Sequence, residues 1–475
     1  MSKLRLYEAV IKSVSGKLST YVVQTASLII TARLFGPQEF GIIASIQVFV
    51  IFFQMLADVG IGPAIINEDN IEPKKRDGIY SVTVIIGVFL AALFYAFTFL
   101  LNDFYGDYNY QDVGLLISFS VLFSALGILP VTSLNKDLKF IQLAIIEVVS
   151  ELLSLSVIFY LYIENYGVIA LAARAPTQSF FKTSLTWFFS KHTTLGRPKI
   201  GRELHHIKAI ASFSIYQFGF NFVNYFSKNM DNVLVGKYIG MESLGVYDRA
   251  YQLMRYPLML TTFAMTPAIQ PVLTKIKKDT SRVSLEHSKL CRRLLLISIP
   301  ISFFLYTNTT SIIGLIFGEK WLEISDVVKV FCFIIPIQTI VAVSGSFFQV
   351  MNRTKVLFKY GIISAAINLT AISYGIFLGD VKSVATMVVI SYALCCVLNK
   401  YMLISSCFDD SVREFVVGLF NIWIIAPPLV LYSYLNMLIE PYYIGGDFLN
   451  LTFSVIVFFS CFTLFFKPLV RCVKC

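Results

Sequence analysis

Residues 79–101 read IYSVTVIIGVFLAALFYAFTFLL, a stretch without a single charged side chain. A helix that crosses the apolar core of a lipid bilayer needs about 20 such residues, because it rises only about 1.5 Å per residue. The flanks differ in charge: Lys74-Lys75-Arg76 precedes the stretch, whereas residues 102–112 after it contain no Lys or Arg. Since basic residues gather on the cytoplasmic side of membrane proteins, the stretch predicts a transmembrane helix that starts at the cytoplasmic face.

The composition of the whole chain indicates the same class of protein. Of its 475 residues, 56% are hydrophobic and only 14% are charged, and the mean hydropathy is +0.72. A soluble domain carries about 25% charged residues. These values exclude a cytosolic enzyme, a nucleic-acid-binding protein and a disordered scaffold.

Apolar runs separated by charged or Gly- and Asn-rich breaks predict fourteen spans, and therefore an all-α integral membrane protein. The segments between the spans are too short to fold as domains. The spans are expected near residues 16–35, 40–66, 79–101, 113–134, 141–163, 165–189, 209–236, 243–271, 291–317, 325–351, 357–378, 381–406, 413–437 and 447–469.

The basic residues alternate between the two sides of these spans. With the N-terminus in the cytoplasm, 28 Lys and Arg fall in cytoplasmic segments, and the opposite side holds Arg33, Lys237, Lys320 and Lys382. The net charge of +10 is thus mostly a topology signal, with both termini cytoplasmic. The basic N-terminus has no small-residue cleavage site after it, so we expect an uncleaved first span.

A short motif occurs twice: residues 33–41 read RLFGPQEFG and residues 237–245 read KYIGMESLG. Six predicted spans separate the copies, so both halves have the same orientation, as in transporters built from parallel repeats. The alternative is convergent loop chemistry at two helix ends. We expect an N-lobe in residues 1–200, a C-lobe in residues 201–408, and two additional spans with a cytoplasmic tail in residues 409–475.

Polar side chains recur every three or four positions along the seventh span, which places them on one helical face. The eighth span and the first span carry similar stripes. Because such groups are costly when they face lipid, we expect them to line a cationic cavity that binds an anionic, sugar-bearing substrate. The candidate binding residues are Gln24, Arg33, Asn221, Asn224, Lys228, Arg249 and Arg255.

Several acidic residues at membrane depth are candidates for ion coupling: Asp58, Glu151, Asp231 and Asp248. For Asp58, Asp231, Lys228 and Arg255 the alternative is a structural ion pair. Four other charged residues lie near span ends, where long side chains snorkel to the interface: Glu147, Lys182, Lys329 and Lys400.

The remaining chemistry argues against catalysis in the membrane. All four His (His192, His205, His206 and His287) fall in predicted cytoplasmic loops, which disfavours a histidine relay or a metal site between the spans. The Cys472–Cys475 pair is a lone CxxC, and no pattern of cysteines predicts a disulfide. We expect no catalytic residue, no metal and no cofactor.

Short motifs in order along the chain are similar to those of one family. They are residues 32–36 (ARLFG) with 39–41 (EFG), 58–61 (DVGI), 136–140 (KDLKF) with Ile146-Glu147, and 317–321 (FGEKW). Together, over about the first 360 residues, they resemble the Wzx-type polysaccharide transporters of the MOP flippase superfamily. The MATE transporters belong to the same superfamily.

This resemblance implies a flippase for undecaprenyl-pyrophosphate-linked oligosaccharide repeat units in the bacterial inner membrane. It implies two lobes around a cationic cavity and alternating access driven by a proton or sodium gradient. The expected partners are the lipid-linked oligosaccharide, membrane lipids and polysaccharide polymerase or assembly proteins, and no nucleic acid. Two alternatives remain open: a multidrug/cation antiporter of the same superfamily, and a membrane enzyme that acts on lipid-linked glycans.

Overall fold

The computed structural model describes residues 3–58, 60–68, 71–204, 225–226, 229–263, 273, 277–408, 412–439 and 447–465. Throughout these residues the regular structure is helical, and they contain no β-strand. This confirms the all-α class that the hydropathy pattern predicts. The chain divides into two compact units, Met1–Gly245 and Val246–Cys475.

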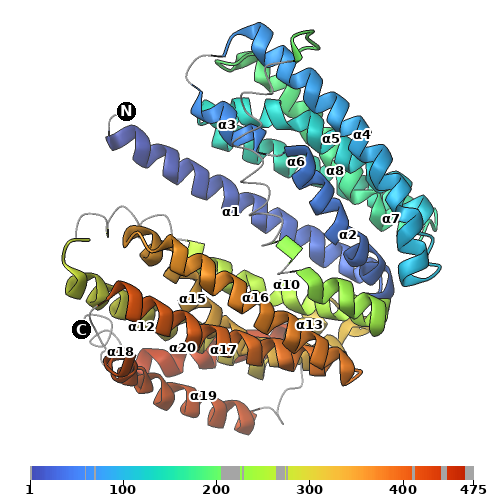
Figure 1. Ribbon diagram of the computed structural model, residues 1–475. Coiled ribbons are helices and arrows are strands. Elements are labelled where there is room, and N and C mark those ends of the chain that lie inside the picture. The colour runs from blue at the N-terminus through green and yellow to red at the C-terminus, as the bar shows by residue number, and fades with distance from the viewer. Residues whose placement is uncertain are drawn as a thin grey trace. The chain divides into compact units, whose positions relative to one another are not determined.

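The first unit consists of long helices and three short helical elements: α1 (Lys3–Leu34), α2 (Pro37–Asp58), α3 (Ile61–Asn67), α4 (Pro73–Tyr105), α5 (Tyr110–Lys136), α6 (Phe140–Ile163), α7 (Val168–Ala172), α8 (Arg174–Phe189) and the 3-10 turn η1 (Ser190–His192). Helix α5 is central, because α2, α4 and α8 all pack against it (Figure 1). Helix α6 packs between α8 and α1.

The second unit has the following helices: α10 (Met241–Phe263, which begins in the first unit), α12 (Thr280–Thr307), α13 (Thr309–Ile316), η3 (Glu319–Trp321), α14 (Ile324–Cys332), α15 (Ile334–Val350), α16 (Thr354–Phe377), α17 (Val381–Cys407), α18 (Val412–Leu419), η4 (Phe420–Ile425), α19 (Ala426–Ile439) and α20 (Asp447–Leu464). Helix α17 packs on α14, α15 and α16, and α12 packs on α14 and α15. The helices α12, α14, α15 and α17 thus form the main core of the unit.

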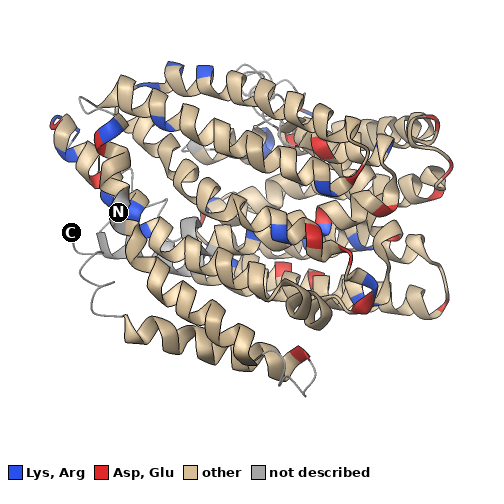
Figure 2. Ribbon diagram, turned by 90° about the horizontal axis from the view of Figure 1, so that it is seen from below, with Lys and Arg blue, Asp and Glu red and all other residues tan. Residues whose placement is uncertain are grey.

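In the part of the chain that the structure describes, nine helical segments are long and apolar enough to cross a membrane. A tenth results if α14 and α15, which meet at a 47° bend, form one broken span. Most of the helical length is uncharged in Figure 2. Large apolar side chains are exposed on these helices, for example Phe377 and Leu464, as expected of surfaces that contact lipid.

The second predicted span, residues 40–66, is broken in the structure. Helix α2 ends at Asp58 and α3 starts at Ile61, and between them Gly60 has φ +76°, in the left-handed region that favours glycine. The backbone N–H of Gly62 points back to Asp58 Oδ1 at 3.5 Å. The apolar run Pro37–Ile66 is therefore one candidate span, and its helix is interrupted where Gly60 adopts the left-handed conformation.

The ninth span is longer than the sequence analysis predicts. The expected boundary is residue 291, whereas α12 begins at Thr280, where the side chain of Asp279 accepts a hydrogen bond from the N–H of Arg282 at 3.0 Å. The first turns are amphipathic, and their buried face includes His287. The prediction that His287 lies in a loop is therefore wrong, because the charged residues on the exposed face masked a helix.

The expectation that Lys400 snorkels to the interface is also wrong. Its side chain lies in the core of the second unit, with 5% of its surface exposed. By contrast, Lys182 pairs with Glu147 at 2.6 Å, and both side chains keep about a third of their surface exposed. Distance from the end of a span thus does not decide whether a lysine reaches solvent, because neighbouring helices can cover it.

The start of α17 is fixed by a side-chain cap outside the span. Asp380 accepts hydrogen bonds from the N–H of Ser383 at 2.8 Å and from the hydroxyl of the same residue. These donors, with the hydroxyl first, hold the pKa of the Asp380 carboxyl below its ordinary value. The cap is thus present as a carboxylate at neutral pH and is lost as the pH falls through that pKa.

Candidate functional site

The most polar part of α10 is a cluster on its first half. Asp248 Oδ2 accepts a hydrogen bond from Arg249 Nη2 at 2.6 Å and a longer one from Gln252 Nε2 at 3.4 Å. Arg249 is 7% exposed. The neighbouring acid and base therefore neutralise each other, and the amide one turn further along completes the group.

Arg255 lies one turn beyond this cluster and differs from it. Its side chain is exposed, and it makes no ion pair within the described residues. Spacing places it on the same side of α10 as Asp248 and Gln252. A guanidinium in this position can give paired hydrogen bonds to a phosphate or carboxylate of an incoming molecule.

The first helix carries the other predicted binding residues of the described part. Gln24 is half-buried near the middle of α1, and Arg33 is exposed in its last turn. The hydroxyls of Thr20 and Thr31 on the same helix bond to carbonyls of their own helix. The hydroxyls of these two threonines are thus satisfied within their own helix.

Three predicted site residues, Asn221, Asn224 and Lys228, lie outside the described residues. Of the acids on the described part, Asp231 is buried and accepts a hydrogen bond from the N–H of Asn232 at 2.9 Å. Asp58 is half-buried at the end of α2, beside the Gly60 turn.

Glu151 is held in an ion pair between α6 and α8. Its carboxylate is 1% exposed and accepts from Arg174 Nη2 and Gln178 Nε2, both at 2.6 Å. Lys182 and Glu147 continue the same row one turn along each helix. The sequence spacing is consistent with these contacts between α6 and α8. Residues 147 and 151 on one span, and 174, 178 and 182 on the next, recur every four positions and therefore lie on one face of each helix.

The two copies of the glycine motif meet within the first unit. A Cβ added to Gly41 would lie 1.7 Å from the carbonyl oxygen of Met241, and one added to Gly245 would lie 1.9 Å from that of Pro37. The first turns of α2 and α10 are therefore in direct backbone contact, which only residues without a side chain permit. The glycine at the end of each copy of the motif thus allows this close packing of the two helices.

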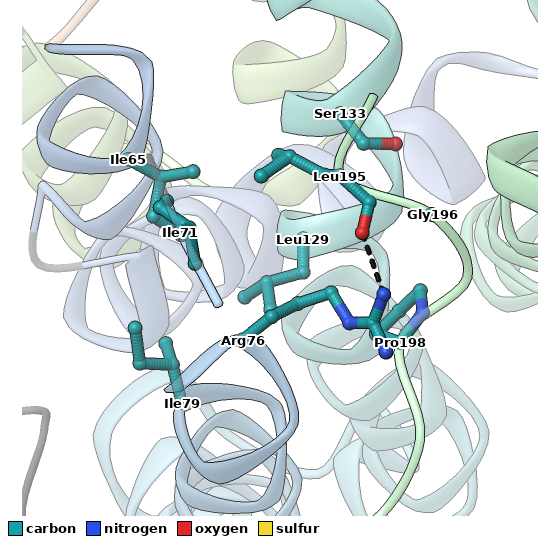
Figure 3. Close-up of a pocket in the computed structure, with 9 residues that line it drawn as sticks. All are labelled: Ile65, Ile71, Arg76, Ile79, Leu129, Ser133, Leu195, Gly196 and Pro198. Atoms are coloured by element: carbon teal, nitrogen blue, oxygen red, sulfur yellow. Dashed lines mark hydrogen bonds between the residues drawn. The ribbon is translucent and has the colours of Figure 1, made fainter. Parts of the chain in front are cut away.

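Residues 193–204 lie against the ends of α4 and α5, where they form a small apolar pocket with Ile65, Ile79 and Leu129 (Figure 3). Arg76 reaches across this pocket and donates to the carbonyl oxygen of Leu195 at 2.5 Å. Asp77 accepts from the N–H of Lys199 at 2.9 Å. The charged groups at the pocket are thus used to fasten the segment to the helices.

The described residues contain no group of three His, Cys, Asp or Glu side chains that could hold a metal ion. The CxxC pair of residues 472–475 lies outside them. The six cysteines at positions 291, 332, 395, 396, 407 and 461 are free thiols.

The amino-acid sequence is similar to those of several known proteins. The chain is 22% identical to the lipopolysaccharide biosynthesis protein WzxC of Escherichia coli, over 89% of its own length and 87% of that protein. It is 25% identical to the teichuronic acid biosynthesis protein TuaB of Bacillus subtilis, over 65% of its own length, and it spans 64% of the length of TuaB.

Among solved structures, the fold is similar to that of the lipid II flippase MurJ in an inward closed conformation. The TM-score is 0.75 at 16% identity, over 97% of this chain and 99% of MurJ. The fold of this chain is therefore similar to that of MurJ over nearly its whole length. Residues 30–326 match the polysaccharide biosynthesis protein family, which is more than half of the chain, and the protein belongs to that family.

Proposed function

We propose that this protein is a flippase that moves undecaprenyl-pyrophosphate-linked oligosaccharide repeat units from the cytoplasmic to the outer leaflet of the bacterial inner membrane. The observation that carries the proposal is the family match over residues 30–326 in a chain with nine described helical segments long and apolar enough to cross a membrane. A polysaccharide biosynthesis protein built in this way acts where the glycan must cross the bilayer. The similarity to the lipopolysaccharide biosynthesis protein WzxC supports the same substrate class.

Binding of the diphosphate is assigned to basic residues on the polar stripes. Arg255 is the best-placed of these on the described part, because its guanidinium is exposed and makes no ion pair with another described residue. Arg249 is buried and paired with Asp248. In this scheme it orients the polar side chains of α10, and it does not bind the substrate by itself. Arg33 and Gln24 on α1, with Asn221, Asn224 and Lys228 on the seventh span, complete the proposed cavity.

Transport in this scheme proceeds by alternating access of the N-lobe (1–200) and the C-lobe (201–408), with residues 409–475 as additional spans. Its energy comes from an ion gradient, for which Asp58, Asp231, Asp248 and Glu151 remain candidates. Among them, Asp58 forms no ion pair within the described residues, whereas Glu151 is paired with Arg174 at 2.6 Å. A carboxylate without such a partner exchanges a proton or sodium ion more readily. We further assign both termini to the cytoplasm.

The test is substitution of Arg255 by Ala. Loss of a charge-assisted pair to phosphate costs about 1.5–3 kcal/mol, so we expect at least about a tenfold fall in surface polysaccharide and in flipping of a fluorescent lipid-linked oligosaccharide in proteoliposomes. Lys359→Ala is the matched control, because Lys359 is an exposed cation on α16 outside the proposed cavity. Wild-type polysaccharide and flipping in Arg255→Ala, at normal membrane levels, would remove Arg255 from the site.

A further inference from the structure

Three titratable side chains meet in the core of the second unit, outside every proposed binding residue. Lys400 Nζ on α17 lies 3.1 Å from His287 Nε2 and 3.6 Å from Cys291 Sγ, and these two residues are one turn apart on α12. The third side, from Cys291 Sγ to His287 Nε2, is 3.4 Å. We call these three residues the buried triangle. Lys400 is 5% exposed, and the other two are fully buried.

The ammonium of Lys400 is surrounded by neutral acceptors. It donates to the carbonyl oxygen of Ile340 and to the hydroxyl of Ser344, both at 2.9 Å and both on α15. Among the described residues, no Asp or Glu forms an ion pair with it. A buried cation without a counter-charge is costly by several kcal/mol, so release of one proton from the triangle removes an uncompensated charge from the core.

His287 adds a second unusual feature. When its Nε2 accepts a hydrogen bond from Lys400, its ring hydrogen must be on Nδ1, and Nδ1 is buried without a partner in the described residues. The ring is enclosed by Phe347, Phe408 and Phe415, at centroid distances of 4.9, 5.5 and 5.3 Å. An unpaired buried N–H costs about 1–3 kcal/mol, so a purely structural histidine would be a poor choice here.

The neighbouring elements bring few other titratable groups to the triangle. Helix α17 adds the thiol of Cys396, which interacts electrostatically with Lys400 and Cys291. Helix α15 contributes Ile340, Ser344 and Phe347, none of which titrates, and α18 contributes the ring of Phe415. The charged residues beside that ring, Arg413 and Glu414, are exposed.

We propose that the buried triangle is a proton-binding site of the second unit. With the proton bound, it consists of an ammonium, a neutral imidazole and a thiol, and carries one positive charge. Release breaks one N–H bond of Lys400 or the S–H bond of Cys291, leaves the electron pair on that atom, and makes the triangle electrically neutral. No other covalent bond changes.

The two states hold the helices together differently. In the protonated state, Lys400 donates to α15 and α12 at once, so it ties α17 to both helices. If Lys400 releases the proton, its amine has one donor fewer. If Cys291 releases it, the thiolate attracts the ammonium of Lys400 toward α12. Since α12, α15 and α17 form the main core of the unit, proton binding changes how this core is held. Coupling of this step to transport rests on the proposed flippase function, whereas the site itself does not.

Nuclear magnetic resonance of the full-length protein, with histidine labelled with nitrogen-15 and in lipid nanodiscs, tests the site without a transport assay. The chain has only four His, so His287→Asn assigns the signals of His287. We expect the ring-nitrogen shifts of His287 to change in one step between about pH 6 and 10, because its Nε2 lies next to Lys400 Nζ and Cys291 Sγ, the groups that release the proton. Constant shifts across this range in the wild-type protein would overturn the proposal.

Two variants separate a proton site from a structural contact. Lys400→Met and Cys291→Ser should each move the midpoint of the His287 step by about one pH unit or more, because each removes a member of the triangle. Cys291→Ser keeps Lys400 and the core volume, so it serves even if Lys400→Met does not fold. Lys382→Met, at the exposed start of α17, is the control and should leave the step in place. A midpoint that stays the same in Cys291→Ser and Lys400→Met would contradict the triangle.

Discussion

At the level of single residues, the structure shows which charged side chains of neighbouring helices are paired. The sequence locates Glu151 and Arg174 within spans but does not show whether they line a cavity. In the structure, Glu151 bonds to both Arg174 and Gln178 and is almost completely buried. The Glu151 carboxylate therefore joins α6 to α8. Any role in ion coupling would come in addition to this structural role.

This pairing leads to a prediction about stability. Glu151→Leu leaves Arg174 without its partner, and loss of one member of a buried pair costs about 3–5 kcal/mol. Because Arg174 is partly exposed, we expect the lower end of that range. Thermal unfolding in detergent measures the effect.

The double variant Glu151→Leu/Arg174→Met provides the control, since it removes both charges and should recover most of the lost stability. If the double variant is as unstable as Glu151→Leu alone, packing rather than the ion pair accounts for the loss.

At the level of helices, breaks and close contacts occur where glycine stands. Gly60 allows the turn between α2 and α3, and Gly41 and Gly245 allow α2 and α10 to touch through their backbones. The sequence repeat points to these glycines, but only the structure shows that the two copies of the motif lie against each other. That contact depends on the absence of two Cβ atoms.

Gly41→Ala should open this contact. The added Cβ would lie 1.7 Å from the carbonyl oxygen of Met241, a distance at which backbone must move. We expect faster amide hydrogen exchange in residues 241–245, together with reduced polysaccharide export. Hydrogen exchange followed by mass spectrometry measures the first effect.

Gly345→Ala is the matched control, because a Cβ there has no atom within 4 Å and its φ is in the ordinary range. It should leave exchange and export unchanged. Unaltered exchange of residues 241–245 in Gly41→Ala would show that the contact does not hold the start of α10.

At the level of the whole molecule, the distribution of Lys and Arg predicts the orientation in the membrane. The connection between α4 and α5 has no Lys or Arg, whereas the segment 190–204 has several. Within the second unit, Asn308, Tyr432 and Ser454 form a buried hydrogen-bonded group, at 2.7 Å each, that joins α19 and α20 to the end of α12.

Cysteine labelling tests the orientation. Asp107→Cys and Ile200→Cys each place a thiol at an exposed position, one in each of these segments. In intact spheroplasts, a maleimide that does not cross membranes should label the first variant and not the second. After lysis both should react.

The wild-type protein sets the background, since six of its eight cysteines are buried or half-buried. Labelling of Ile200→Cys but not Asp107→Cys before lysis would invert the proposed topology.

Hydropathy and charge alone determined the all-α membrane class, because a bilayer imposes a fixed length and a charge asymmetry on every crossing segment. Short motifs such as residues 32–36 and 317–321 carried the family resemblance. The tertiary structure decided the environment of each charged residue. Spacing places Lys400 near a span end and His287 in a loop, yet α12, α15 and α17 bury them together. Which side chains meet depends on the packing of helices distant in sequence, and a periodic pattern on one helix carries no information about its partner.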